Sequence, residues 1–104
     1  MRTVDLALYA DVLAARASAV AAQLERKRDA LRQVAIEREA RRALGADALV
    51  RLERLGVVTV ADVRALRAEI AELAADLAAL EELQAWVERR LADARTDTVR
   101  STAA

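Results

Sequence analysis

Apolar residues recur at alternating spacings of three and four along both halves of this 104-residue chain. Such spacing is typical of an α-helix that packs along its whole length against another helix. We call these positions the seam. Its first half comprises Leu6, Ala10, Leu13, Ala17, Val20, Leu24, Lys27, Leu31 and Val34. Its second half comprises Val63, Leu66, Ile70, Leu73, Leu77, Leu80, Gln84, Val87 and Leu91.

The two halves of the seam match each other in opposite directions, which predicts a long antiparallel coiled-coil hairpin. One constant register pairs Leu13 with Leu91, Ala17 with Val87, Leu24 with Leu80, Leu31 with Leu73 and Val34 with Ile70. Arg38 and Arg41 then fall where the seam of the first helix should continue, so the two-stranded pairing must fail there. We expect the connector between the long helices to fill that gap.

The composition supports an all-α fold, because the chain has 27 alanines, no proline and only two glycines. The predicted helices span about residues 5–43, 47–55 and 60–95. They form one helical-hairpin domain over residues 1–96, followed by a flexible tail over 97–104. Two helices bury one stripe each and enclose little interior, so a lone hairpin of this size is marginally stable. We therefore expect dimerisation into a four-helix bundle.

Capping residues mark the predicted helix ends. Thr3 is the expected N-cap of the first helix, and Thr59 with Asp62 resembles a capping box at the start of the last. Gly56 is expected to end the short helix in the left-handed conformation. The apolar connector residues should cap the closed end of the hairpin. They are Leu44, Leu49, Leu52, Leu55, Val57 and Val58.

Charged residues are unevenly distributed although the net charge is zero. Residues 25–56 hold nine basic and six acidic side chains, whereas residues 57–88 hold two basic and seven acidic ones. The predicted register brings Arg28 level with Asp76 and Arg32 level with Glu72, while Glu25 and Asp29 offer partners on the same helix. We interpret these charges as ion pairs that select register and orientation rather than as a binding surface.

Arginines near the closed end give the alternative interpretation, a nucleic-acid-binding surface. They are Arg38, Arg41, Arg42, Arg51 and Arg54. Acidic residues lie between them, and the aromatic residues Tyr9 and Trp86 are at the other end of the predicted hairpin, away from where bases would stack. The sequence therefore disfavours nucleic acid as a partner without excluding it.

The chain has few side chains suited to catalysis, because it contains no histidine and no cysteine. It has no glycine-rich phosphate loop, and its acidic residues do not converge as metal ligands do. We expect no enzyme activity, no catalytic residue, no cofactor, no metal site and no small-molecule substrate. The absence of a signal-peptide pattern and of a long apolar run favours a cytoplasmic protein that does not enter a membrane. Sixteen arginines against one lysine are typical of a GC-rich bacterial genome.

Surplus apolar residues near the open end of the hairpin give the functional prediction. Between residues 4 and 24 only Asp5, Asp11 and Arg16 are charged, so the first helix carries a second apolar stripe that one partner helix cannot cover. The predicted protein interface comprises Leu8, Tyr9, Val12, Ala15, Ala19, Leu83 and Trp86. The sequence thus predicts a helical adaptor, scaffold or assembly subunit that forms a homodimer or homo-oligomer. The alternative is that a different protein covers the same interface.

Overall fold

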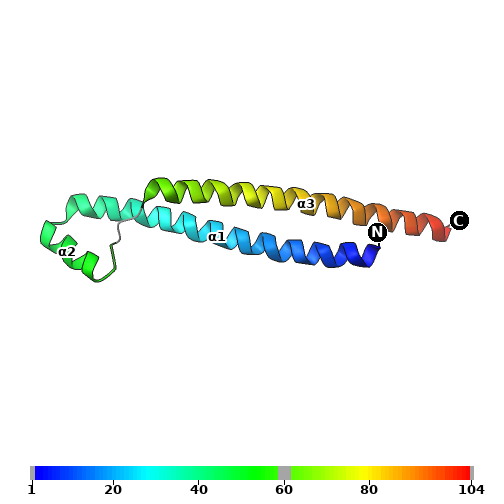
Figure 1. Ribbon diagram of the computed structural model, residues 1–104, viewed down its shortest axis with the longest axis horizontal. Helices are drawn as coiled ribbons and strands as arrows, with labels where there is room; N and C mark the ends of the chain where they lie inside the picture. Colours follow the sequence, from blue (N-terminus) through cyan, green and yellow to red (C-terminus); the bar gives the residue numbers. More distant parts are fainter. Residues whose placement is uncertain (1, 59–61, 104) are drawn as a thin grey trace. The chain divides into compact units, whose positions relative to one another are not determined.

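The computed structural model describes residues 2–58 and 62–103, and every element in those ranges is an α-helix (Figure 1). Helix α1 spans Thr3–Ala43, α2 spans Ala46–Arg54 and α3 spans Val63–Ala103. The predicted all-α class and the order of long, short and long helix are confirmed. Because the chain lacks proline and has its two glycines in the connector, nothing interrupts either long helix.

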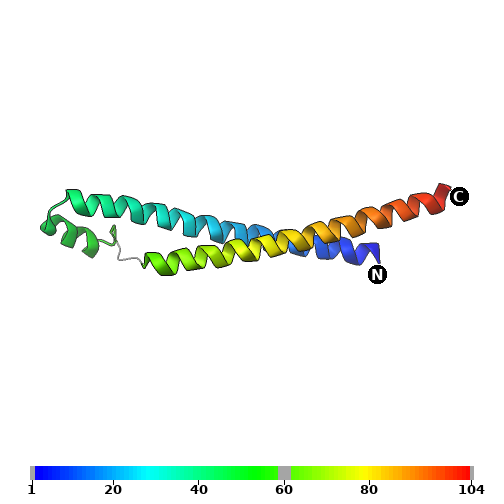
Figure 2. The same ribbon diagram turned by 90° about the horizontal axis from the view of Figure 1, so that it is seen from above.

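The chain divides into two compact units, and both long helices contribute a segment to each. Unit 1 comprises Met1–Ala22 and Leu73–Ala104, and unit 2 comprises Gln23–Glu72 with α2. Within each unit the α1 segment lies antiparallel beside the α3 segment (Figures 1 and 2). The helical-hairpin pairing is thus present in each unit, whereas the extent of a single domain over 1–96 stays a prediction.

The seam forms the packed face of the helices. Every predicted seam position is buried or half-buried. In unit 1 the buried core consists of Leu6, Leu13, Val87 and Leu91, with Ala10, Leu80 and Leu83 packed against it. Val87 is fully buried. The alternation of three and four residues therefore identified the face that each helix turns toward its neighbour.

The predicted register, by contrast, is wrong by about one heptad. It places Leu77 opposite Lys27, but the Lys27 ammonium lies 2.7 Å from the carboxylate of Glu69, eight residues earlier. It also places Ile70 opposite Val34, but Val34 lines grooves together with Val63 and Leu66. A shift of seven residues leaves every seam residue facing the partner helix, so the apolar pattern cannot tell the two registers apart.

The helix starts differ from the predicted caps by one to three residues. The carbonyl of Arg2 accepts hydrogen bonds from the Asp5 and Leu6 amides at 3.1 and 3.2 Å, so Thr3 is the first helical residue rather than the cap. Asp62 is itself the N-cap of α3, because its carboxylate accepts a hydrogen bond from the Ala65 amide at 3.0 Å. Thr59 lies outside the described residues.

Helix α3 continues past residue 95, where the sequence pattern weakens. The Thr96 hydroxyl donates a hydrogen bond to the Ala92 carbonyl at 3.0 Å, which keeps this β-branched polar residue within the helix. The last residues before Ala103 include neither glycine nor proline. The helical part of α3 therefore includes most of the segment predicted as a tail.

In the connector, α2 begins without a side-chain cap and ends in a hydrogen-bonded glycine turn. Gly45 precedes α2 in an extended conformation without a side-chain cap. At the other end Gly56 adopts a φ of 74°, which confirms the predicted left-handed glycine. Its amide donates to the Glu53 carbonyl at 3.0 Å, and the Val57 amide donates to the Leu52 carbonyl at 3.1 Å. These two hydrogen bonds define a Schellman motif, which fixes the direction in which the chain leaves α2.

Candidate interaction surfaces

The second apolar stripe of α1 is exposed, as the sequence predicted. We call it the outward stripe: Leu8, Val12, Ala15, Ala19 and Ala22, all exposed in unit 1. The side chains of Leu8 and Val12 are 61% and 58% exposed. At about 100° per residue, the outward stripe lies about 160° around the helix from the seam. It is therefore on the far side of α1 from α3.

The α3 residues of the predicted interface fall into two groups. Leu83 packs against the core of unit 1, so it belongs to the hairpin itself. Trp86 is 42% exposed, and the Arg90 guanidinium lies 5.9 Å from the centre of its ring. Tyr9 of α1 is also partly exposed. Trp86 and Tyr9 remain available as anchors, whereas Leu83 does not.

The arginines near the closed end lie in unit 2, and one differs from the rest. Arg41 is half-buried and forms an ion pair with Glu53 of α2 at 3.0 Å. The others are exposed: Arg38, Arg42, Arg51 and Arg54. Arg38 and Arg42 also line a groove of about 270 Å³ together with Arg67 of α3. Val34 is level with the start of α3. Beyond it α1 contacts α2 through the pair of Arg41 with Glu53, which explains why an arginine can follow the seam there.

The apolar connector residues are covered only in part, with Leu49 and Leu52 half-buried. Val58 is buried, but Leu55 is 73% exposed and Leu44 and Val57 are exposed as well. No residue of α2 is buried. A helix of nine residues beside a single partner has too little neighbouring surface to cover its apolar side chains. Sequence reasoning missed this exposure because it assumed that a cap must be covered.

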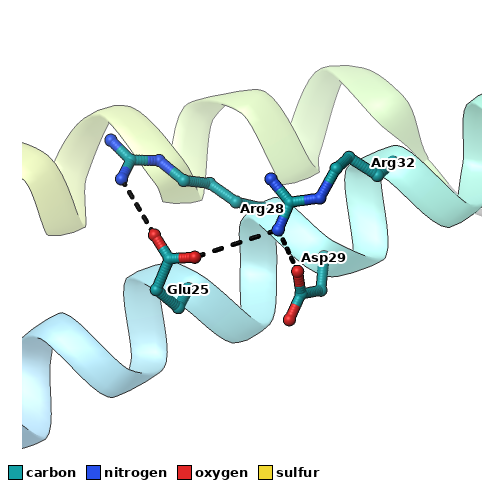
Figure 3. Close-up of polar contacts among 4 residues, drawn as sticks. All are labelled: Glu25, Arg28, Asp29 and Arg32. Carbon is teal, nitrogen blue, oxygen red and sulfur yellow. Dashed lines mark hydrogen bonds and ion pairs between the residues drawn. The ribbon is translucent and has the colours of Figure 1, made fainter.

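Ion pairs in unit 2 run mostly along α1 itself (Figure 3). The Glu25 carboxylate lies 3.2 Å from the Arg28 guanidinium and 3.8 Å from that of Arg32, which also pairs with Asp29. Arg32 therefore pairs on its own helix rather than with Glu72. The predicted pair of Arg28 with Asp76 would join the two units and stays a prediction.

An ion pair between Lys27 and Glu69 links the two long helices within unit 2. The Lys27 ammonium lies 2.7 Å from the Glu69 carboxylate, although Lys27 occupies a seam position. Both side chains are about half exposed. The lysine stem thus covers the seam while its charged end reaches solvent and Glu69. This pair ties the unit to the register seen in the structure.

A buried carboxylate is the feature that sequence reasoning did not find. Glu37 is 7% exposed and accepts a hydrogen bond from the Gln33 side-chain amide at 3.2 Å. It lines a groove of about 340 Å³ with Val34, Leu66 and Glu69. The sequence did contain a signal for it. Glu37 lies three residues after Val34, on the packed face of α1, and Gln33, four residues before it, carries an amide that can reach its carboxylate.

The described residues contain no group of three side chains suited to hold a metal ion. Over the same ranges, none of the helices has the length and apolar character that a membrane span needs. Comparison of the chain with protein-family models, with curated proteins and with solved structures gives no match. The functional argument therefore rests on the surfaces themselves.

Proposed function

We propose that this chain is a non-catalytic protein–protein interaction module, serving as an adaptor, scaffold or assembly subunit, and that it forms a homodimer through unit 1. The observation that carries the proposal is the exposure of Leu8 and Val12 on the side of α1 that faces away from α3. A helix that is apolar on opposite sides is typical of one that is covered on both. Burying such side chains is worth about 25 cal/mol per Å² of apolar surface removed from water.

In the proposed dimer the α1 and α3 segments of two unit 1 copies pack together as a four-helix bundle. The outward stripe supplies the contact, and the partly exposed Tyr9 of the same helix acts as an anchor at its margin. Tyrosine suits this role because it buries a large apolar area while its hydroxyl stays accessible to partners or water. A second copy is the preferred partner because a marginally stable hairpin gains core from it.

The lack of histidine and cysteine supports a non-catalytic role. The grooves described above are shallow surface features of unit 2, and the residues lining them include no candidate nucleophile activated by a neighbouring base. A role in assembly needs no such chemistry, only complementary surfaces.

Light scattering on the purified chain tests the proposal. The wild type is expected to be dimeric at tens of micromolar, and Leu8→Glu is expected to raise the dissociation constant. Leu55→Glu is the matched control, because Leu55 is also an exposed leucine but lies in unit 2. A wild-type monomer at that concentration, with no protein bound to it, contradicts the proposal.

The second candidate is an accessory nucleic-acid-binding or transcription-associated function. It is favoured by the groove that Arg38, Arg42 and Arg67 share in unit 2. Binding through phosphates would weaken steeply as salt rises. A gel shift at low salt that Arg42→Glu abolishes would favour this candidate, and Arg41→Glu is the less informative variant because Arg41 already pairs with Glu53. No shift at low salt removes it.

A further inference from the structure

The outward stripe has a heptad pattern of its own. Its spacings are four, three, four and three, so Leu8, Ala15 and Ala22 occupy d positions and Val12 and Ala19 occupy a positions of a second coiled-coil repeat. The repeat stops after Ala22, because Arg26 and Asp29 take the next a and d positions. The segment of α1 in unit 1 therefore carries two seams on nearly opposite sides, and α3 covers one of them.

The residues that flank the outward stripe distinguish between the two ways of pairing it. In a parallel pair, a g residue lies beside the e residue five positions later on the partner. Asp11 is at g and Arg16 is at e, five positions later. Both side chains are exposed, and within the described part of the chain neither forms an ion pair. Two parallel copies thus place each Asp11 beside the Arg16 of the other copy, twice by symmetry.

A second flanking pair follows the same rule. Val4 is at g and Tyr9 is at e, and both are exposed. Parallel pairing therefore brings an apolar side chain against an aromatic ring on each side of the dimer. Antiparallel pairing instead sets e against e, which brings Arg16 near the Arg16 of the other copy and Tyr9 near Gln23. Within parallel coiled coils, valine at a with leucine at d, as at Val12 and Leu8, favours two strands over three or four.

We infer that two copies of this chain associate in parallel, α1 against α1, through the outward stripe, with Asp11 of each copy paired to Arg16 of the other. This inference rests on the proposed function, since it specifies how the self-association of unit 1 occurs. It places the two α1 segments in contact with each other, and each α3 segment lies on the opposite side of its own α1. The alanines at Ala15, Ala19 and Ala22 let the two helices approach closely over the second half of the stripe.

Single-cysteine variants test the orientation cleanly, because the chain has no cysteine of its own. In a parallel dimer Leu8→Cys and Ala22→Cys each form a disulfide with an identical copy. A mixture of the two variants forms no mixed disulfide, because the positions lie about 21 Å apart along the helix. Mixed disulfides without the homotypic ones overturn the parallel arrangement. A dimer that forms neither product overturns the outward stripe as the interface, while self-association itself stands.

Charge reversal gives a second test that does not depend on crosslinking. Asp11→Arg and Arg16→Asp should each raise the dissociation constant about fivefold at low salt, because an attractive pair becomes a repulsive one on both sides. The double variant Asp11→Arg with Arg16→Asp should restore the wild-type value. Arg89→Asp is the control, since Arg89 is exposed in unit 1 outside the stripe. Failure of the double variant to recover overturns the pairing, and a monomeric wild type overturns the proposed function with it.

Discussion

The two units of this chain are built from the same two helices but are held by different forces. Unit 1 has a compact apolar core around Val87, and an ion pair joins the neighbours Arg2 and Asp5 at the helix start. Unit 2 buries Val34 and Val58 but also the carboxylate of Glu37, and ion pairs lie along and between its helices. The difference shows that apolar burial holds the helices together, whereas charged side chains and caps determine their register and where each helix begins and ends.

The largest expected effect comes from the core of unit 1. Leu13→Ala should lower the free energy of unfolding by about 3 kcal/mol, because it removes a buried side chain and leaves a cavity. Leu55→Ala is the same change at an exposed position of unit 2 and should stay within about 0.5 kcal/mol. Urea unfolding followed by circular dichroism measures both. Equal losses for the two variants would contradict the assignment of the core.

The turn after α2 should show the next largest effect. Gly56→Ala forces a Cβ into the left-handed region and should cost about 1 kcal/mol. Gly45→Ala is the matched control, because Gly45 has an extended conformation and a Cβ there meets no atom within 4 Å. Chemical denaturation again gives the comparison. If Gly45→Ala proved as costly as Gly56→Ala, the Schellman motif would not explain the requirement for glycine.

The cap of α3 is expected to contribute about as much or slightly less. Asp62→Ala removes the acceptor for the Ala65 amide and should cost about 1 kcal/mol, whereas Asp62→Asn keeps an acceptor oxygen and should cost less. Hydrogen exchange of the Ala65 amide, measured by NMR, reports the loss directly. Equal exchange rates in both variants would show that this hydrogen bond does not stabilise the helix start.

The smallest expected effect belongs to the ion pair between Lys27 and Glu69. A double-mutant cycle with Lys27→Met and Glu69→Gln should give a coupling energy of about 0.5 kcal/mol or less, since both groups are about half exposed. The coupling should shrink as salt rises, because screening weakens exposed pairs. Coupling that persists in 1 M salt would indicate a packing contact rather than an electrostatic one.

The sequence was sufficient to predict which face of each helix is buried, but not the register in which the two helices pair. The period of three and four residues identifies Leu13 and Val87 as buried, because only a helical face repeats in that way. It cannot separate registers that differ by seven residues, so Val34 was assigned to Ile70 rather than to Val63. The information that separates them lies in particular atoms, such as the Lys27 ammonium and the Glu69 carboxylate.

The candidate surfaces divide in the same way. The exposure of Leu8 and Trp86 was predictable, since one partner helix cannot cover two stripes. The packing of the half-buried Leu83 against the core was not, because a residue at the edge of the seam can turn either way. Glu37 was also missed, since a pattern of apolar residues says nothing of a carboxylate that finds a side-chain amide inside the packed face.

The placement of the aromatic rings makes the two units distinguishable by spectroscopy. Trp86 and Tyr9 both belong to unit 1, and the chain has no phenylalanine and no further tryptophan or tyrosine. Fluorescence of tryptophan and tyrosine therefore reports on unit 1 alone, whereas far-ultraviolet circular dichroism of the backbone reports on both units. Melting curves recorded by the two probes will coincide if the chain unfolds in one cooperative step and will separate if each half melts independently.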